Sequence, residues 1–426
     1  MPLLGSSLLQ QSGNMIDLAF AGRFLGKEAA AAVGSGSLLA ACMIGFFTGI
    51  GVGTGITVSQ AFGTKEINAL KKIIQTSVAV SFLGGILVLI LGYVLAGTFL
   101  VWLNTPDEIL GLAEQYLRLY FCSLIPLLIY NAGSGILRAL GNSKGPMLYQ
   151  LAAGGAHVAA NFLFIRVLDL GVRGPALAAI CSQSLAAVLV LSRLSRLEES
   201  YRLRFGRLRI HGESLLKVLS VGIPAGIQAM VLTLSNLLVQ YYINGLGVDI
   251  IAAFIAYFKA ENFIYLPIMA LSQANTVFAG QNMGAGKAKR VKRGVSVCIF
   301  LGLAVTLSIS ALLLLLSRQV FGLFSNDPQV IEIGGQIART TFPLYFLYVF
   351  LEAFSSAVRG AGKAVPPMLI TLSTMCVLRV GLLGYLIRFF PSPAGVAAVY
   401  PVTWAAAAVS MAIYYKKGRW MPAKDL

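Results

Sequence analysis

Residues 73–101, IIQTSVAVSFLGGILVLILGYVLAGTFLV, contain no charged side chain. A helix needs about 20 mainly apolar residues to cross the hydrocarbon core of a bilayer, and this stretch is longer than that. Residues 295–317 form a second stretch of the same kind. Because 57% of the 426 residues are hydrophobic and only 12% are charged, the chain lacks the polar residues that would cover a soluble domain. These features predict an all-α polytopic membrane protein.

Apolar windows separated by polar, proline or glycine breaks predict twelve transmembrane helices. We place them at residues 2–22, 36–61, 73–102, 112–137, 146–166, 173–194, 215–243, 250–280, 295–317, 334–357, 366–389 and 394–415. The five cysteines lie singly in separate apolar segments, which is typical of small core residues rather than of disulfides or metal ligands. We therefore expect neither a cofactor nor a bound metal.

The net charge of +17 is concentrated in alternate loops. Of the 33 Lys and Arg residues, 23 lie in the loops after spans 2, 4, 6, 8 and 10 and in the C-terminal tail. Cytoplasmic loops carry such an excess, so both termini are predicted to be cytoplasmic. Orientation in the membrane explains the basic segments 193–213 and 284–293 better than nucleic-acid binding does, and no nucleic-acid partner is expected.

The chain contains an internal repeat at an offset of 221 residues. Residues 58–72 resemble residues 279–293, and residues 137–148 resemble residues 358–369. Since six spans are an even number, both copies have one orientation and are related by a pseudo-two-fold axis along the membrane normal. We predict an N-terminal six-helix lobe at 1–194, a basic cytoplasmic linker at 195–214, and a C-terminal six-helix lobe with a short basic tail at 215–426.

Six motifs spread along the chain resemble those of one transporter family. They are NMIDLAFAGRFLGKEAAAAVG, VSQAFGTKE, ILRALGNSKGPM, GVRGPALAAICSQ, FAGQNMGAGKAKR and AVRGAGKAVPPM. With them the chain resembles bacterial multidrug and toxic compound extrusion (MATE) transporters. The resemblance implies a secondary transporter rather than an enzyme. It also implies that inward movement of H⁺ or Na⁺ drives the export of amphipathic, often cationic compounds from the bacterial cell.

Asp17 is an acid inside the first predicted span. Ser7, Gln10, Asn14 and Asp17 fall on one helical face, and such a polar stripe must face protein or water rather than lipid. Burial disfavours the charged carboxylate, so Asp17 could bind a proton, or it could hold Na⁺ with neighbouring oxygens. The resemblance points to Asp17 as the coupling acid. The repeat places Leu238 at the equivalent position of the second half, so the fold itself does not require an acid there. This favours a functional role of Asp17 in the N-terminal lobe, and a purely structural Asp is the alternative.

The fifth span departs from the family pattern. Many relatives have Asn and Asp four residues apart where this chain has His157 and Asn161, and Ala179 replaces the usual Thr of span 6. Fewer oxygen ligands favour H⁺ over Na⁺. Histidine changes its charge near neutral pH, so we hypothesise a proton relay between Asp17 and His157. A neutral histidine that is hydrogen-bonded in the core is the alternative.

Candidate cavity residues in the second half are Tyr257, Glu261, Met269 and Glu352. Aromatic and Met side chains suit flat amphipathic substrates, but they are also ordinary packing residues. Glu261 could bind substrate or cation or form an ion pair, and Glu352 could contribute to coupling. We expect a monomer in contact with membrane lipids. A Na⁺-coupled exporter, a lipid-linked precursor flippase and a membrane-embedded enzyme are the rival functions.

Overall fold

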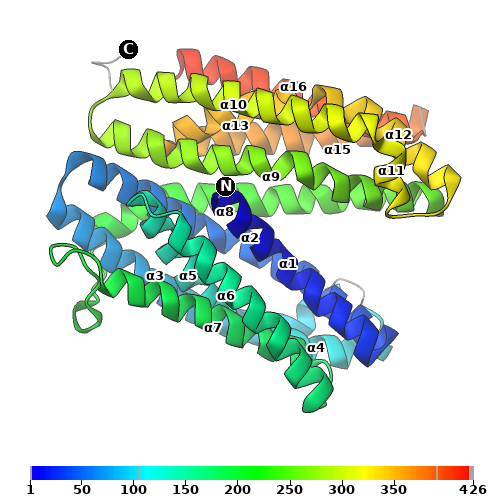
Figure 1. Cartoon of the computed structure of the whole chain (residues 1–426), viewed down its shortest axis with the longest axis horizontal. Helices are drawn as coiled ribbons and strands as arrows, with labels where there is room; N and C mark the ends of the chain where they lie inside the picture. Colours follow the sequence, from blue (N-terminus) through cyan, green and yellow to red (C-terminus); the bar gives the residue numbers. More distant parts are fainter. Residues whose placement is uncertain (1, 103–104, 390–391, 422–426) are drawn as a thin grey trace. The chain divides into compact units, whose positions relative to one another are not determined.

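The structure is a computed structural model that describes residues 2–102, 105–389 and 392–421. The side chains of Ser7, Gln11, Arg207, Ile387, residues 36–39 and residues 41–42 are outside this description. The regular secondary structure of the described residues is helical, and turns and short loops join the helices (Figure 1). The α-helices are α1 (Pro2–Phe20), α2 (Lys27–Thr64), α3 (Ile67–Trp102), α4 (Asp107–Cys122), α5 (Leu124–Ala139), α6 (Lys144–Asn161), α7 (Arg173–Ser195), α8 (Gly212–Asn244), α9 (Val248–Gly284), α10 (Ala288–Leu315), α11 (Ser317–Gly322), α12 (Pro328–Thr341), α13 (Phe346–Gly360), α14 (Val365–Thr371), α15 (Arg379–Phe389) and α16 (Pro393–Lys417).

Short irregular helices extend or join several of these elements. Three are π-helical, namely η1 (Ala21–Leu25), η2 (Phe162–Val167) and η5 (Leu372–Leu378), and two are 3₁₀-helical, namely η3 (Phe205–Arg207) and η4 (Phe342–Leu344). All twelve predicted spans fall on helical segments. Within the described residues, nine helical segments are long and apolar enough to cross a membrane, and the bent pair Pro328–Leu344 and Phe346–Gly360 would make ten. The spans predicted at 2–22 and 36–61, on α1 and α2, are outside that set, so their crossing of the membrane remains a prediction.

The chain divides into two compact units, residues 1–227 and 228–426. The division falls inside α8, whose first part belongs to unit 1, and the lobe boundary predicted in the loop 195–214 stays a prediction. In unit 1, α6 packs against both α1 and α7, and the three helices run side by side in Figure 1. A buried cluster that includes Tyr116, Tyr120 and Ala179 forms one part of the unit 1 core.

The backbone shows the internal repeat independently of side-chain similarity. Three pairs of residues with positive φ stand 221 residues apart, namely Gly26 and Gly247 (90° and 110°), Lys65 and Gly286 (60° and 66°), and Gly141 and Gly362 (90° and 85°). Residues with a Cβ rarely adopt this region, so these turns have demanding backbone geometry. The two copies therefore share the same kind of backbone turn at three places, namely the start of the second long helix, the end of that helix, and the entry to the fifth span.

Glycines allow helices of unit 1 to approach closely. A Cβ on Gly85 of α3 would lie 2.8 Å from the Cα of Ile125 in α5, and one on Gly135 of α5 would lie 2.7 Å from the carbonyl oxygen of Gly51 in α2. Small residues at helix contacts are typical of membrane bundles, where close backbone packing replaces hydrophobic association. Helix α5 is held in this way between α2 and α3.

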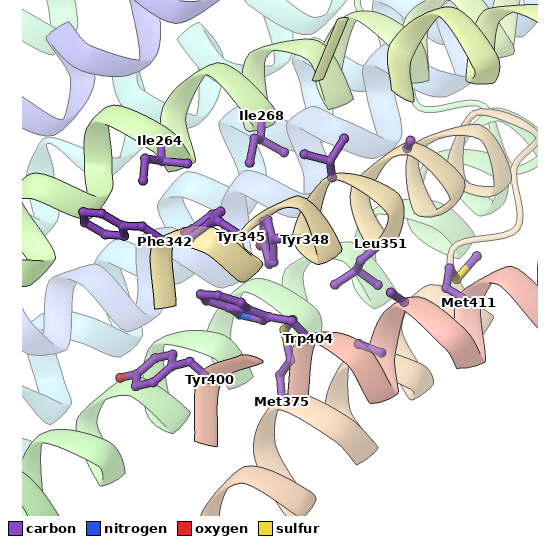
Figure 2. Packing of buried hydrophobic residues seen from close by; sticks show 14 of the residues in the cluster. Ile264, Ile268, Phe342, Tyr345, Tyr348, Leu351, Met375, Tyr400, Trp404 and Met411 are labelled. Carbon is purple, nitrogen blue, oxygen red and sulfur yellow. The ribbon is translucent and has the colours of Figure 1, made fainter. Parts of the chain in front are cut away.

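The core of unit 2 is aromatic. Figure 2 shows Trp404 of α16 between the pair Tyr345–Tyr348 on one side and Tyr400 on the other. The Trp404 ring centroid lies 4.5 Å from that of Tyr345 and 6.0 Å from that of Tyr400. Aromatic pairs at these separations stabilise a core beyond the area that they bury. The cluster joins α16 to the η4–α13 segment.

Candidate functional site

Asp17 of α1 is 1% exposed and lies against two polar residues of α6. His157 Nε2 is 2.6 Å from Asp17 Oδ1, and Asn161 Nδ2 donates to the same oxygen at 3.0 Å. His157 and Asn161 are one helical turn apart, so both side chains point at α1. The three residues predicted as the cation-coupling group therefore meet in one buried cluster, although their role in coupling remains a prediction.

The imidazole of His157 is also held on its other side. His157 Nδ1 is 3.0 Å from Ser182 Oγ of α7, and Ser182 Oγ donates to the carbonyl oxygen of Ala179 at 3.1 Å. Asn161 Nδ2 also donates to the carbonyl oxygen of His157, at 3.2 Å. A chain of contacts thus runs from α1 through α6 to α7, and every side chain in it is buried.

The short contact between Asp17 and His157 requires a shared proton. Two lone pairs at 2.6 Å would repel each other, whereas an N–H···O or O–H···N bond that involves a charged or acidic group is typically this short. Either the imidazole donates to a carboxylate or a carboxylic acid donates to the imidazole. The pair can therefore hold one proton between its two heavy atoms, and Nδ1 can carry a further one.

Three oxygen atoms around this pair have no hydrogen-bond partner among the described residues. They are Asp17 Oδ2, Asn161 Oδ1 and the hydroxyl oxygen of Tyr116, and all three are buried. Tyr116 and Tyr120 of α4 are close enough to interact electrostatically with Asp17. The carboxylate thus has one oxygen bound by nitrogen atoms and a second oxygen that can still accept a hydrogen bond.

The rest of the predicted polar stripe on α1 is more open. Gln10 and Asn14 are exposed; Gln10 Nε2 donates to Asn131 Oδ1 of α5 at 3.4 Å, and Asn14 Oδ1 accepts from the Tyr120 hydroxyl at 3.5 Å. Both distances are at the long end for hydrogen bonds. The predicted side chain of Ser7 lies outside the described residues. The stripe is therefore polar and accessible at Gln10 and Asn14 and closed at Asp17.

The candidate cavity residues of unit 2 form two separate groups. In the first, Glu261 Oε1 accepts from the Tyr345 hydroxyl at 3.0 Å, and the buried hydroxyl of Tyr257 lies beside Glu261 and Thr341. The Tyr257 ring stacks on Phe342 with centroids 5.6 Å apart, and Met269 packs against the same core. Among the described residues Glu261 makes no ion pair within 4 Å. The geometry therefore does not support the ion pair that was the alternative role of Glu261.

The second group surrounds Glu352. Its Oε2 accepts from Arg359 Nη2 at 2.8 Å and from Ser272 Oγ at 2.6 Å, and the carboxylate is almost fully buried. A buried pair with a second hydrogen-bond donor compensates the cost of removing both charges from water. This geometry supports a structural ion pair for Glu352 and gives its coupling role no direct support.

Sequence reasoning missed several members of the site. Ser182 lies one turn beyond Ala179, the position at which a hydroxyl was expected, and the spacing of three residues was the available signal. Tyr116 and Tyr120 are four residues apart on α4, and so share a face. Across the described part of the chain, no group of three or more His, Cys, Asp or Glu residues could hold a metal ion.

Long apolar helices in two units, with a buried titratable pair inside one of them, define a multi-pass membrane transporter. The MatE family model matches residues 2–163 and 224–385, which together are most of the chain. The chain belongs to this family, whose members are secondary transporters and not enzymes. The two matched stretches have equal length, and the second begins 222 residues after the first, which is within one residue of the offset of 221 found in the sequence. The duplication is therefore confirmed.

Relatives and solved structures agree with this assignment. The probable multidrug resistance protein YpnP of Bacillus subtilis is 28% identical over 100% of this chain and 95% of its own length. The probable multidrug resistance protein NorM of Thermotoga maritima is 23% identical over 92% of this chain and 84% of its own length. The crystal structure of a MATE transporter in the bent conformation has a TM-score of 0.91 at 20% identity, over 98% of this chain and 93% of that one. This structural likeness shows that the fold is shared.

Proposed function

We propose that this chain is a proton-coupled exporter of small amphipathic, often cationic compounds, and that the pair of Asp17 and His157 binds the coupling proton. The observation that carries the proposal is the 2.6 Å contact between His157 Nε2 and Asp17 Oδ1, both buried and 140 residues apart in sequence. Ionisable residues at membrane depth are costly and usually belong to an ion pathway.

The surroundings of the carboxylate favour H⁺ over Na⁺ as the coupling ion. Hard cations take several oxygen ligands, whereas Asp17 Oδ1 is bound by two nitrogen atoms, from His157 and Asn161. A proton needs only one acceptor, and the imidazole of His157 provides one 2.6 Å from the carboxylate. This chemistry matches loading and release of a proton between compartments of different pH.

The substrate class is proposed from the relatives and from the polar stripe. Relatives at 28% and 23% identity are named as probable multidrug resistance proteins. Gln10 and Asn14 offer uncharged polar groups on the accessible part of the stripe, which is two and one helical turns from Asp17. We infer that an amphipathic solute contacts this stripe and that protonation of the pair releases it.

Location and orientation follow from the charge of the loops. The alternation of basic loops supports a multi-pass protein of the bacterial cytoplasmic membrane with both termini in the cytoplasm. In this orientation inward proton movement provides the free energy for outward export.

The test is efflux of a fluorescent lipophilic cation from reconstituted vesicles under a pH gradient or a Na⁺ gradient, each imposed separately. We expect the pH gradient to drive transport, and we expect Asp17→Asn and His157→Gln to abolish it. Asp249→Asn is the matched control, because this acid lies in the first turn of α9 in unit 2 and should leave transport unchanged. Transport by the Na⁺ gradient alone, or full activity of Asp17→Asn, would refute the proposal.

A further inference from the structure

The contact between His157 and Ser182 gives the serine hydroxyl two alternative acceptors. It has one proton to donate, and both the carbonyl oxygen of Ala179 and Nδ1 of His157 lie within reach, at 3.1 and 3.0 Å. If the hydroxyl donates to Ala179, then Nδ1 must carry a proton in order to donate to Ser182 Oγ. If the hydroxyl donates to Nδ1, that nitrogen must be bare.

The direction of this hydrogen bond is therefore tied to the number of protons on the pair. One proton always lies between His157 Nε2 and Asp17 Oδ1, because of their short separation. With a bare Nδ1 the pair holds one proton and has a net charge of −1. With a protonated Nδ1 it holds two protons and is neutral. Gain of one proton from water thus turns the Ser182 hydroxyl from Nδ1 towards the backbone carbonyl.

Building on the proposed function, we propose that Ser182 is a positioning residue whose hydroxyl stabilises the proton-loaded form of the Asp17–His157 pair by accepting from His157 Nδ1. In the loaded form the hydroxyl accepts from His157 Nδ1 and donates to the carbonyl oxygen of Ala179, and both of these atoms lie within hydrogen-bond distance of Ser182 Oγ. Loss of a buried acceptor leaves a donor unsatisfied and disfavours the state that needs it.

Unit 2 contains the same arrangement with a permanent cation. Arg379 donates to Thr403 Oγ1 from Nε at 3.4 Å and from Nη2 at 3.2 Å, and Thr403 Oγ1 donates to the carbonyl oxygen of Tyr400, three residues earlier, at 2.9 Å. Ser182 makes the same bond to the carbonyl three residues before it. Arginine is always protonated, so a hydroxyl that accepts from it must donate elsewhere.

Arg379 and His157 come from corresponding helices. In order along the repeat, the helix that contains Arg379 corresponds to α6, and α16 corresponds to α7. Unit 2 thus shows the hydroxyl geometry that goes with a fixed positive charge, and unit 1 shows it around a residue that can lose its charge. Thr403 therefore shows the hydroxyl geometry that we expect for Ser182 in the loaded form of unit 1.

Few other groups bear on the titration of this pair. Among the described residues His157 of α6 is the one basic side chain within 4 Å of the Asp17 carboxylate, and the hydroxyls of Tyr116 and Tyr120 from α4, which also interact electrostatically with Asp17, are neutral at working pH. On α7 the ionisable neighbour of Ser182 is Cys181, which is exposed. No other charged group should therefore obscure the change in proton affinity of the Asp17–His157 pair when the Ser182 hydroxyl is removed.

The experiment compares the pH dependence of proton-driven efflux in wild type, Ser182→Ala, Ser182→Thr and Ser184→Ala. Because the loaded form loses its acceptor in Ser182→Ala, we expect half-maximal transport to move to lower pH by about one unit, a tenfold change in proton affinity. Ser182→Thr keeps the hydroxyl and should restore the wild-type profile. Ser184→Ala removes a hydroxyl from the same helix and should shift nothing.

A spectroscopic readout separates this proposal from the proposed function. The chain has only two histidines, so ¹⁵N-histidine labelling of His211→Gln leaves the ring of His157 alone to observe. We expect a bare Nδ1 with protonated Nε2 above the titration and two protonated nitrogens below it, with the titration moved to lower pH in Ser182→Ala.

Three outcomes would overturn the role of Ser182. They are an unshifted profile for Ser182→Ala, an equal shift for Ser184→Ala, and a His157 ring that, above the titration and with Ser182 in place, has its single proton on Nδ1 rather than on Nε2. The last of these needs no substitution at Ser182, so the proposal stays testable if Ser182→Ala fails to fold. If Asp17→Asn and His157→Gln still abolish transport in these cases, the proposed function stands without the serine.

Discussion

Asn131 of α5 and Glu352 of α13 occupy equivalent positions in the two copies of the repeat. Arg138 and Arg359, seven residues further on, are likewise equivalent. In the second copy the carboxylate accepts from Arg359 Nη2 at 2.8 Å, whereas in the first copy Arg138 Nε donates to the carbonyl oxygen of Ser134 at 3.2 Å. Of these two equivalent arginines, Arg359 thus donates to a buried carboxylate and Arg138 donates to a backbone carbonyl oxygen.

Glu352→Gln should therefore destabilise unit 2 more than it affects coupling. The substitution leaves the guanidinium of Arg359 buried without its counter-charge, and breaking such a pair costs about 3–5 kcal/mol. Thermal unfolding in detergent measures the loss. Glu332→Gln, which breaks an exposed pair with Arg339, is the control and should cost less than about 1 kcal/mol. Unchanged stability with loss of efflux would instead make Glu352 a coupling acid.

Asn161→Leu should move the pH of half-maximal efflux upward, opposite in sign to Ser182→Ala. Asn161 Nδ2 donates to Asp17 Oδ1, and a donor on a carboxylate favours its charged form. Without this donor the pair binds its proton more tightly and releases it only at higher pH. Asn282→Leu is the matched control, since Asn282 Nδ2 donates to the carbonyl of Phe278 four residues earlier but contacts no carboxylate. A downward shift for Asn161→Leu would contradict this account.

Two adjacent glycines of α3 should respond in opposite directions to alanine. A Cβ on Gly85 would meet the Cα of Ile125 at 2.8 Å, so Gly85→Ala must push α3 from α5 and should cost about 1–3 kcal/mol. A Cβ on Gly84 meets nothing within 4 Å, and Gly84→Ala should stabilise the helix by up to about 1 kcal/mol. Unfolding temperatures of the two variants give the comparison, and similar values would show that α3 and α5 are not tightly packed there.

Lys65→Gly should stabilise the end of α2. Lys65 has a φ of 60°, a conformation that costs an L-residue with a side chain about 1 kcal/mol, and its equivalent Gly286 adopts 66° as glycine. Part of this gain is lost because glycine is more flexible in the unfolded chain, so we expect about 0.5 kcal/mol. The reciprocal Gly286→Ala should destabilise by a similar or larger amount. A loss of stability in Lys65→Gly would show that the lysine side chain stabilises this turn.

Much of the fold could be predicted because the membrane imposes long apolar helices and the repeat imposes matching turns. All twelve predicted spans coincide with helical segments, and Gly141 and Gly362, which lie in segments aligned from sequence alone, both have a positive φ. The limits of the two compact units were harder to predict. Helix α8 is continuous from Gly212 to Asn244, and no break in its sequence marks the division after Ile227.

The site was predictable only in part. Asp17 was found because an acid in an apolar span is conspicuous. His157 and Asn161 were found because the family resemblance places them where many relatives have Asn and Asp. Ser182 was missed because alignment on the family motif directs attention to Ala179, and one helical turn places the serine on the same face. The partner of Glu352 was also readable in principle, since Arg359 lies seven residues on and therefore two turns along one face. Which of several such pairs form depends on how neighbouring helices pack, and spacing alone does not determine that.

The π-helical segments have a consequence for any exchange of parts between the two copies. A π-turn accommodates an extra residue, and η5 (Leu372–Leu378) precedes Arg379, whereas η2 (Phe162–Val167) follows His157 and Asn161. The offset of 221 pairs His157 with Leu378. Because the π-turn of η5 adds one residue before this position, it is Arg379 that contacts Thr403 as His157 contacts Ser182. A chimera that transplants side chains at a constant spacing would rotate this stretch by about 100° and present the wrong face. The two halves share an ancestry but have lost their interchangeability in this stretch.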